Sequence, residues 1–100
     1  MDDRTLLERA AKAAGIELRR WNNAYAGYET AQGIWNPLLD DGDALRLGIE
    51  LGFAIRYPAN IEACVSIRGV IMIEAFLPRH DKYAATRRAI VRAAAALAKD

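Results

Sequence analysis

The feature that most constrains the fold is a stretch of alternating side chains over residues 61–77. Apolar and polar positions alternate along Ile61–Arg68, and this two-residue period suits a strand with one buried face. Gly69 lies where a tight turn would fall, and alternating apolar residues resume after it. The stretch therefore predicts a β-hairpin. Its inward side chains would be those of Ile61, Ala63, Val65, Ile67, Ile71, Ile73, Ala75 and Leu77.

The opposite face of this predicted hairpin carries Cys64, Met72 and Phe76 as well as charged residues. A face wholly exposed to water would not need three such residues together. Either a helix covers part of this face, which would place the sheet between two helical layers, or a partner chain covers it. We favour the helix.

Three further segments have the three- and four-residue spacing of apolar side chains that is typical of amphipathic helices. The first covers residues 2–14 and closes at Gly15, and the second covers residues 44–51 and closes at Gly52. The third begins after Asp81, which can act as its N-cap, and extends to about residue 98. The predicted buried faces carry Leu45, Gly48 and Ile49 in the second helix, and Tyr83, Thr86, Ile90, Ala94 and Leu97 in the third.

Shorter extended segments over residues 16–21, 25–30 and 53–57 complete the predicted order, α-β-β-α-β-β-β-α. Two-residue hairpins imply a mainly antiparallel sheet, whose faces the helices must cover. A chain of 100 residues is long enough for one core but not for two. We therefore expect residues 1–100 to form a single α+β domain, an α/β/α layered sandwich.

Composition excludes several classes of function. Fourteen basic and thirteen acidic residues leave a net charge of +1, which predicts no nucleic-acid or membrane partner. One cysteine and one histidine exclude an internal disulfide and a zinc site with four His or Cys ligands. The sequence begins with acidic residues rather than a secretory signal, and it holds no apolar run of membrane-spanning length. We expect a cytoplasmic protein.

The acidic run of Asp40, Asp41 and Asp43 could suggest a site for Ca²⁺ or Mg²⁺. It lacks the alternating ligands and the distal glutamate of an EF-hand, so we interpret it as a turn and a helix N-cap. His80 is interpreted as a loop residue and Cys64 as a structural thiol. The sequence thus predicts no catalytic residue, no metal site and no cofactor.

Basic residues concentrate only on the last predicted helix, where Arg88, Arg92 and Lys99 share one face. A nucleic-acid surface needs several cations on one face, often with aromatic residues between them. Ala95 interrupts this face and no aromatic residue lies in it. A solvated helix face is the favoured interpretation, and nucleic-acid binding remains the alternative.

Aromatic residues concentrate between positions 21 and 35, the least regular part of the sequence. Large aromatic side chains dominate the energetics of protein interfaces, but they also fill the edges of small cores. We favour the core while keeping both interpretations. The candidate partner-binding residues are Trp21, Tyr25, Tyr28 and Trp35, together with Met72 and Phe76 of the hairpin.

Residues 35–38, Trp-Asn-Pro-Leu, are followed at 40–47 by Asp-Asp-Gly-Asp-Ala-Leu-Arg-Leu. With residues 2–7, 13–16 and 83–94, these segments resemble the phage ABA-sandwich domain proteins, a family of small phage and prophage proteins. The resemblance spans nearly the whole chain except the hairpins. It implies an α/β/α sandwich and no chemistry, because the family has no established activity or catalytic residues.

Together these observations predict a non-enzymatic accessory protein from a phage or prophage that binds a host or phage protein in the bacterial cytoplasm. Inhibition of a host defence factor is one use of such binding. A homodimer is a further expectation if the outer apolar residues of the hairpin are uncovered. The competing hypotheses are nucleic-acid binding and, least favoured, a metal-dependent enzyme that uses the acidic run.

Overall fold

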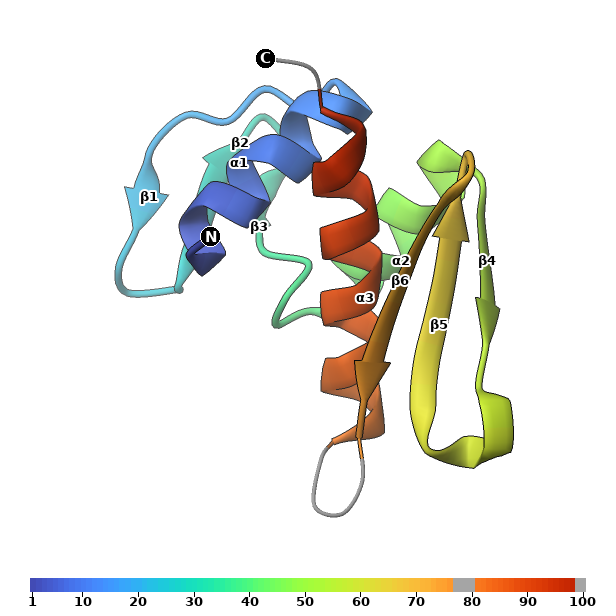
Figure 1. The fold of residues 1–100 in the computed structure, drawn as a ribbon. Coiled ribbons are helices and arrows are strands. Elements are labelled where there is room, and N and C mark those ends of the chain that lie inside the picture. The colour runs from blue at the N-terminus through green and yellow to red at the C-terminus, as the bar shows by residue number, and fades with distance from the viewer. Residues whose placement is uncertain (77–80, 99–100) are drawn as a thin grey trace.

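The computed structural model describes residues 1–76 and 81–98. In this part of the chain, helices flank two antiparallel three-stranded sheets, β1-β2-β3 and β4-β5-β6 (Figure 1). The elements in chain order are α1 (Asp3–Ala14), β1 (Trp21–Asn22), β2 (Gly27–Thr30), β3 (Gly33–Trp35), α2 (Asp41–Leu51), β4 (Phe53–Arg56), the 3₁₀ turn η1 (Pro58–Asn60), β5 (Glu62–Ile67), β6 (Val70–Ala75) and α3 (Lys82–Leu97).

The predicted α+β class and the mainly antiparallel pairing are confirmed, with one strand more than expected before α2. That strand is β3, which forms because a two-residue turn pairs Gly33 with Thr30. The segment predicted as a first strand over residues 16–21 contributes only its last residue to β1. None of the helices in the described part of the chain is both long and apolar enough to cross a membrane.

Each helix begins after an aspartate N-cap, and the first two helices end at a glycine. The carboxylates of Asp2, Asp40 and Asp81 each accept a hydrogen bond from a backbone N–H in the first turn of the helix that follows. Gly15 and Gly52 end the first two helices with φ of 72° and 76°. Because the cap of α2 is at position 40, this helix begins three residues before the predicted start at residue 44.

The hairpin forms as predicted, but the side chains of its second strand face the opposite way. A turn of only two residues pairs Ile67 with Val70, and paired residues of antiparallel strands share a face. Val70 and Met72 therefore continue the inward face, and Ile71 and Ile73 point outward and are exposed. The prediction was wrong because it assumed that odd-numbered residues stay inward after the turn, whereas the even-numbered ones do.

Two further hairpin positions also need correction. Ala75 faces outward with the isoleucines. Phe76, expected on the outward face, is buried beyond the end of β6, and Leu77 lies outside the described residues. The outward face therefore carries Cys64 with Ile71 and Ile73, and within the described chain these isoleucines have no helix over them.

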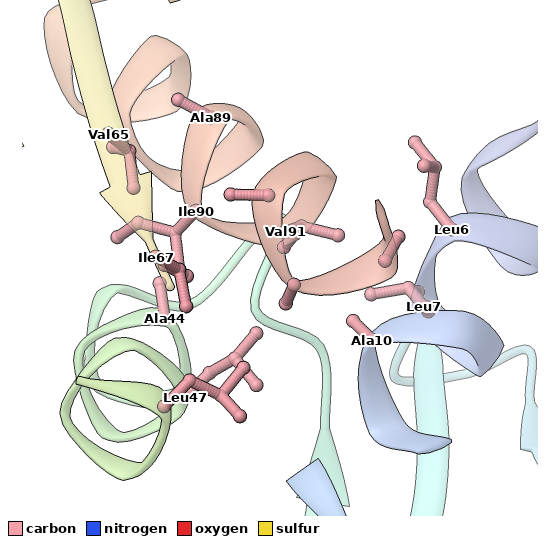
Figure 2. Packing of buried hydrophobic residues seen from close by; sticks show 14 of the residues in the cluster. Leu6, Leu7, Ala10, Ala44, Leu47, Val65, Ile67, Ala89, Ile90 and Val91 are labelled. Carbon is pink, nitrogen blue, oxygen red and sulfur yellow. The ribbon is translucent and has the colours of Figure 1, made fainter. Parts of the chain in front are cut away.

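Helix α3 lies at the centre of the molecule, between α1 and the β4-β5-β6 sheet (Figure 1). Figure 2 shows its Val91 directed toward Leu7 of α1, and its Ile90 toward Ile67 of β5. Many of its buried positions are alanine, so neighbouring elements approach closely. One core cluster joins all three helices with both sheets.

Because α3 is surrounded on several sides, the narrow apolar face predicted for it is only partly right. Ile90 and Ala94 are buried as expected, but Tyr83 is 69% exposed. Helix α2 shows a similar difference, because Leu45 and Ile49, predicted inward, are exposed. Its buried residues are Asp43, Ala44, Leu47, Gly48 and Leu51.

Candidate functional site

The aromatic residues between positions 21 and 35 serve mainly as core beside α1. Tyr28 and Trp35 are only 4% and 8% exposed. Trp21 is half-buried, meets the Tyr28 ring edge to face at 5.1 Å and lies under the Arg4 guanidinium at 4.7 Å. Tyr25, 71% exposed, is the member of this group that presents its ring to solvent.

The other two candidate partner-binding residues lie in a different part of the molecule. Met72 is half-buried on the inward face of β6, and Phe76 is buried with its ring 6.3 Å from that of Tyr57. The two sheets lie on opposite sides of α1 and α3 (Figure 1). The six predicted residues therefore do not form one continuous surface.

The arginines of the predicted basic face are paired with carboxylates. Arg88 lies 2.7 Å from Asp3, and Arg92 pairs with Glu74 while also donating to the backbone carbonyl of Ile73 at 3.5 Å. Lys99 lies outside the described residues. A carboxylate beside each arginine neutralises part of the positive charge that would attract a phosphate backbone.

The acidic run is placed as a turn and helix start, as interpreted from the sequence. Asp40 caps α2, Asp41 pairs with Arg87, and Asp43 is buried and accepts a hydrogen bond from a backbone N–H. Across residues 1–76 and 81–98, no group of three or more His, Cys, Asp or Glu side chains is placed to hold a metal ion.

The Trp-Asn-Pro-Leu motif has a structural role that centres on Asn36. Its side chain is buried, donates from Nδ2 to the carbonyl of Ala26 at 2.6 Å and accepts at Oδ1 from the Leu38 N–H at 2.9 Å. Its own backbone N–H donates to Asp43 Oδ2 at 2.9 Å. These bonds fix the path from the first sheet into α2.

The sequence also offers two isolated reactive residues, Cys64 and His80. Cys64 is buried on the central strand of the second sheet, where Arg56 Nη2 lies 3.5 Å from its sulfur. His80 lies outside the described residues, so its predicted role as a loop residue stays a prediction.

Exposed apolar side chains instead surround a groove of about 370 Å³ between α2, α3 and β4. Leu45 is 51% exposed, Tyr57 37% and Tyr83 69%, and exposed apolar residues grouped around a hollow are typical of binding sites. The residues that line it are Asp41, Ala44, Leu45, Phe53, Ile55, Tyr57, Tyr83, Thr86, Arg87 and Ile90.

One wall of the groove is held by the contacts of Tyr57. Its hydroxyl is hydrogen-bonded to Thr86 Oγ1 at 2.7 Å. Lys82 Nζ lies 4.4 Å from the centre of its ring and also donates to Asn60 Oδ1 at 2.9 Å. The ring of Phe76 meets it edge to face. Contacts within the chain therefore hold the Tyr57 ring in one position.

The charged end of the groove is fixed by Arg87. Its Nη1 lies 2.6 Å from Asp41 Oδ1, and its Nε donates to the backbone carbonyl of Leu38 at 2.8 Å. The guanidinium is largely buried, so this pair joins α3 to the start of α2.

The third constraint on the groove is a close approach of α2 to β4. A Cβ atom added at Gly48 would lie 2.4 Å from Cδ2 of the Phe53 ring. No real contact is that short, so the ring and the helix lie this close only because residue 48 has no side chain. Glycine here sets the separation of α2 from β4.

Sequence reasoning missed this groove because it assigned Leu45 and Tyr83 to the core. A signal was nevertheless present: α2 carries large apolar residues on two sides, Leu47 and Leu51 on one and Leu45 and Ile49 on the other. A short helix in a small domain buries only one such side.

Searches of protein-family models, of curated proteins and of solved structures return no match to this chain.

Proposed function

We propose that this chain is a non-enzymatic protein-binding module and that the groove between α2, α3 and β4 is its contact surface. The observation that carries the proposal is the grouping of Leu45, Tyr57 and Tyr83, three large exposed side chains, around one groove. Tyrosine is among the residues that contribute most to binding energy in protein interfaces.

The fixed walls support the same proposal. Contacts within the chain hold Tyr57 and Arg87 in place, so binding would cost little ordering of side chains on this surface. A surface that exposes apolar groups and is already rigid suits the recognition of another protein.

The resemblance to small phage proteins supplies the proposed setting. The module would act in the cytoplasm of a bacterial host and bind a host or phage protein, and occupying the surface of a defence factor is one way in which it could act. This setting rests on the motif residues over positions 35–47 and on the two helical ends.

The experiment compares capture of bacterial proteins by the wild-type chain and by two matched variants, read by quantitative mass spectrometry. Leu45→Ser with Tyr83→Ser changes the groove, and Tyr25→Ser changes an equally exposed tyrosine in the turn between β1 and β2. We expect a partner that is lost with the groove variant and retained with Tyr25→Ser, then confirmed by calorimetry with the purified proteins.

The opposite pattern would contradict the proposal. A partner that is lost with Tyr25→Ser but retained with the groove variant would move the contact surface to the first sheet. Thermal unfolding of each variant checks that the fold is kept, as expected for exposed positions.

A further inference from the structure

We propose that the outer edge of β4 binds an extended segment of the partner protein as an added strand, and that this segment alternates apolar with acidic side chains. The inference rests on the proposed function and names the kind of partner that the groove accepts. It is carried by the backbone of β4, by the groove beside it and by the charge on its other side.

Two of the four residues of β4 direct their backbone groups away from the sheet. The Phe76 N–H donates to the Ile61 carbonyl at 3.0 Å, so these two residues form a hydrogen-bonded pair. Every second residue of β5 from Ile61 onward therefore bonds to β6, and the residues between them bond to β4. With the observed register, Ala54 and Arg56 direct their N–H and C=O groups to β5. Phe53 and Ile55 then direct theirs outward, and β4 is the outermost strand of its sheet (Figure 1).

The side chains of these same two residues face the groove. Phe53 and Ile55 pair with Ile67 and Val65 on the helix side of the sheet, and both line the groove with Leu45. A strand added beside Ile55 would place alternate side chains on this side of the sheet. Those side chains would enter the groove and should be apolar.

The remaining side chains of the added strand would lie on the outward face beside Arg56. This guanidinium contacts the Cys64 sulfur, and among the described residues no carboxylate forms an ion pair with it. Opposite charges on neighbouring strands stabilise a sheet. Acidic residues at the outward positions of the added strand would therefore form ion pairs with Arg56.

The other edge of the same sheet is less suited to an added strand. On β6 the outward-directed carbonyl of Ile73 already accepts from Arg92, which is paired with Glu74. A charged side chain that reaches over a strand edge is a common protection against strand addition. Within the described chain, β4 has no such cover.

A second copy of the chain fits this edge less well than an acidic segment does. If two copies paired antiparallel about Ile55, both Arg56 side chains would lie on one face, opposite Ala54 of the other copy. Neither arginine would then have a carboxylate opposite it, so self-pairing lacks the cross-strand attraction that an acidic segment supplies. Self-pairing through β4 is therefore an outcome that the test must distinguish.

The test uses the full chain, ¹⁵N-labelled, and a synthetic peptide of about six residues that alternates leucine with glutamate. We expect titration to shift the amide signals of Phe53 and Ile55 and to slow their exchange with solvent. Of two peptides N-methylated either at every leucine or at every glutamate, the one whose blocked N–H groups face β4 cannot donate to this edge, and its binding should weaken at least about tenfold. A leucine–lysine peptide should bind about two- to fivefold more weakly than the leucine–glutamate peptide, and Arg56→Glu should reverse this order.

Two variants separate this inference from the proposed function. Ile55→Pro removes an outward N–H without removing a β4–β5 hydrogen bond, and Ile55→Val keeps the N–H with a similar side chain. Partner capture that is lost with the groove variant but unaffected by Ile55→Pro would retain the proposed function and overturn strand addition. Strand addition would also be overturned if a saturating concentration of the peptide left the amide signals of residues 53–56 unshifted. Amide shifts that depend only on the concentration of the chain, and not on the peptide, would indicate self-pairing and would overturn it as well.

Discussion

The surroundings of the two sheets differ in where they place large apolar side chains. In the first sheet, Tyr28 and Trp35 are turned into the core, and Arg4 covers the exposed side of Trp21. Beside the second sheet, Leu45 and Tyr83 stay in solvent around the groove. The region richest in aromatic residues is thus the more closed one.

The difference teaches that local composition does not locate the exposed apolar surface. The β1-β2-β3 sheet is small, with strands of two to four residues, and such a sheet needs large side chains to pack against a helix. The second sheet already packs on α3 through Ala63, Val65 and Ile67. Apolar residues at its margin are not needed for the core and remain exposed.

The largest expected effect tests this division of roles directly. Trp35→Ala should lower the free energy of unfolding by about 3–5 kcal/mol, because it removes a buried aromatic side chain from the core. Tyr83→Ala, at an exposed position, should change it by less than about 0.5 kcal/mol. Urea unfolding of both variants gives the comparison, and similar losses would show that the two regions do not differ.

Much of the fold could be predicted because it depends on local signals. Asp2, Asp40 and Asp81 cap helices, and Gly15 and Gly52 end them, through interactions within a few residues of the sequence. These signals need no knowledge of tertiary packing, so helix ends were placed correctly or to within a few residues.

The groove could not be predicted because it depends on what α2 and β4 pack against. An apolar spacing shows that Leu45 and Ile49 share a side of α2, but not whether another element covers that side. The parity of the Ile67–Val70 turn likewise decides which face Ile71 occupies. The choice on α2 is made by tertiary contacts, since Leu47 and Ala44 pack in the core instead. The choice in the hairpin is made by the length of its turn.

The next effect concerns the contact that sets the width of the groove. Gly48→Ala should destabilise the protein by about 1–3 kcal/mol, because the new Cβ would collide with the Phe53 ring and outweigh the gain in helix propensity. Phe53→Leu in the same chain should recover part of the loss. Thermal unfolding of the single and double variants measures the coupling, and equal effects of Gly48→Ala in both backgrounds would contradict the proposed contact.

A smaller effect distinguishes a structural role for the arginines of α3 from nucleic-acid binding. Arg88→Glu and Arg92→Glu place a carboxylate beside Asp3 and Glu74, so each should lower stability by about 1 kcal/mol in urea unfolding. The nucleic-acid alternative instead expects a salt-sensitive mobility shift with DNA or RNA that these changes abolish. A wild-type shift at low salt that both variants lose, with stability unchanged, would favour that alternative.

The smallest effect lies in the closed region and depends on pH. Burial, and then the hydrogen bond to Glu8, raise the pKa of the Tyr28 hydroxyl above its ordinary value of 10.0. The folded state therefore holds this proton more tightly than the unfolded state, so the contribution is complete below the ordinary pKa and is lost as pH rises through the raised one. Tyr28→Phe should cost about 1 kcal/mol near neutral pH, and its difference from the wild type should shrink as the pH rises above 10.0. Urea unfolding of both proteins across this range measures the difference, in which the other tyrosines and the lysines cancel. A difference that stays constant with pH would mean that the Tyr28 hydroxyl is not closed off from solvent, and the contrast between the two sheets would then be one of shape alone.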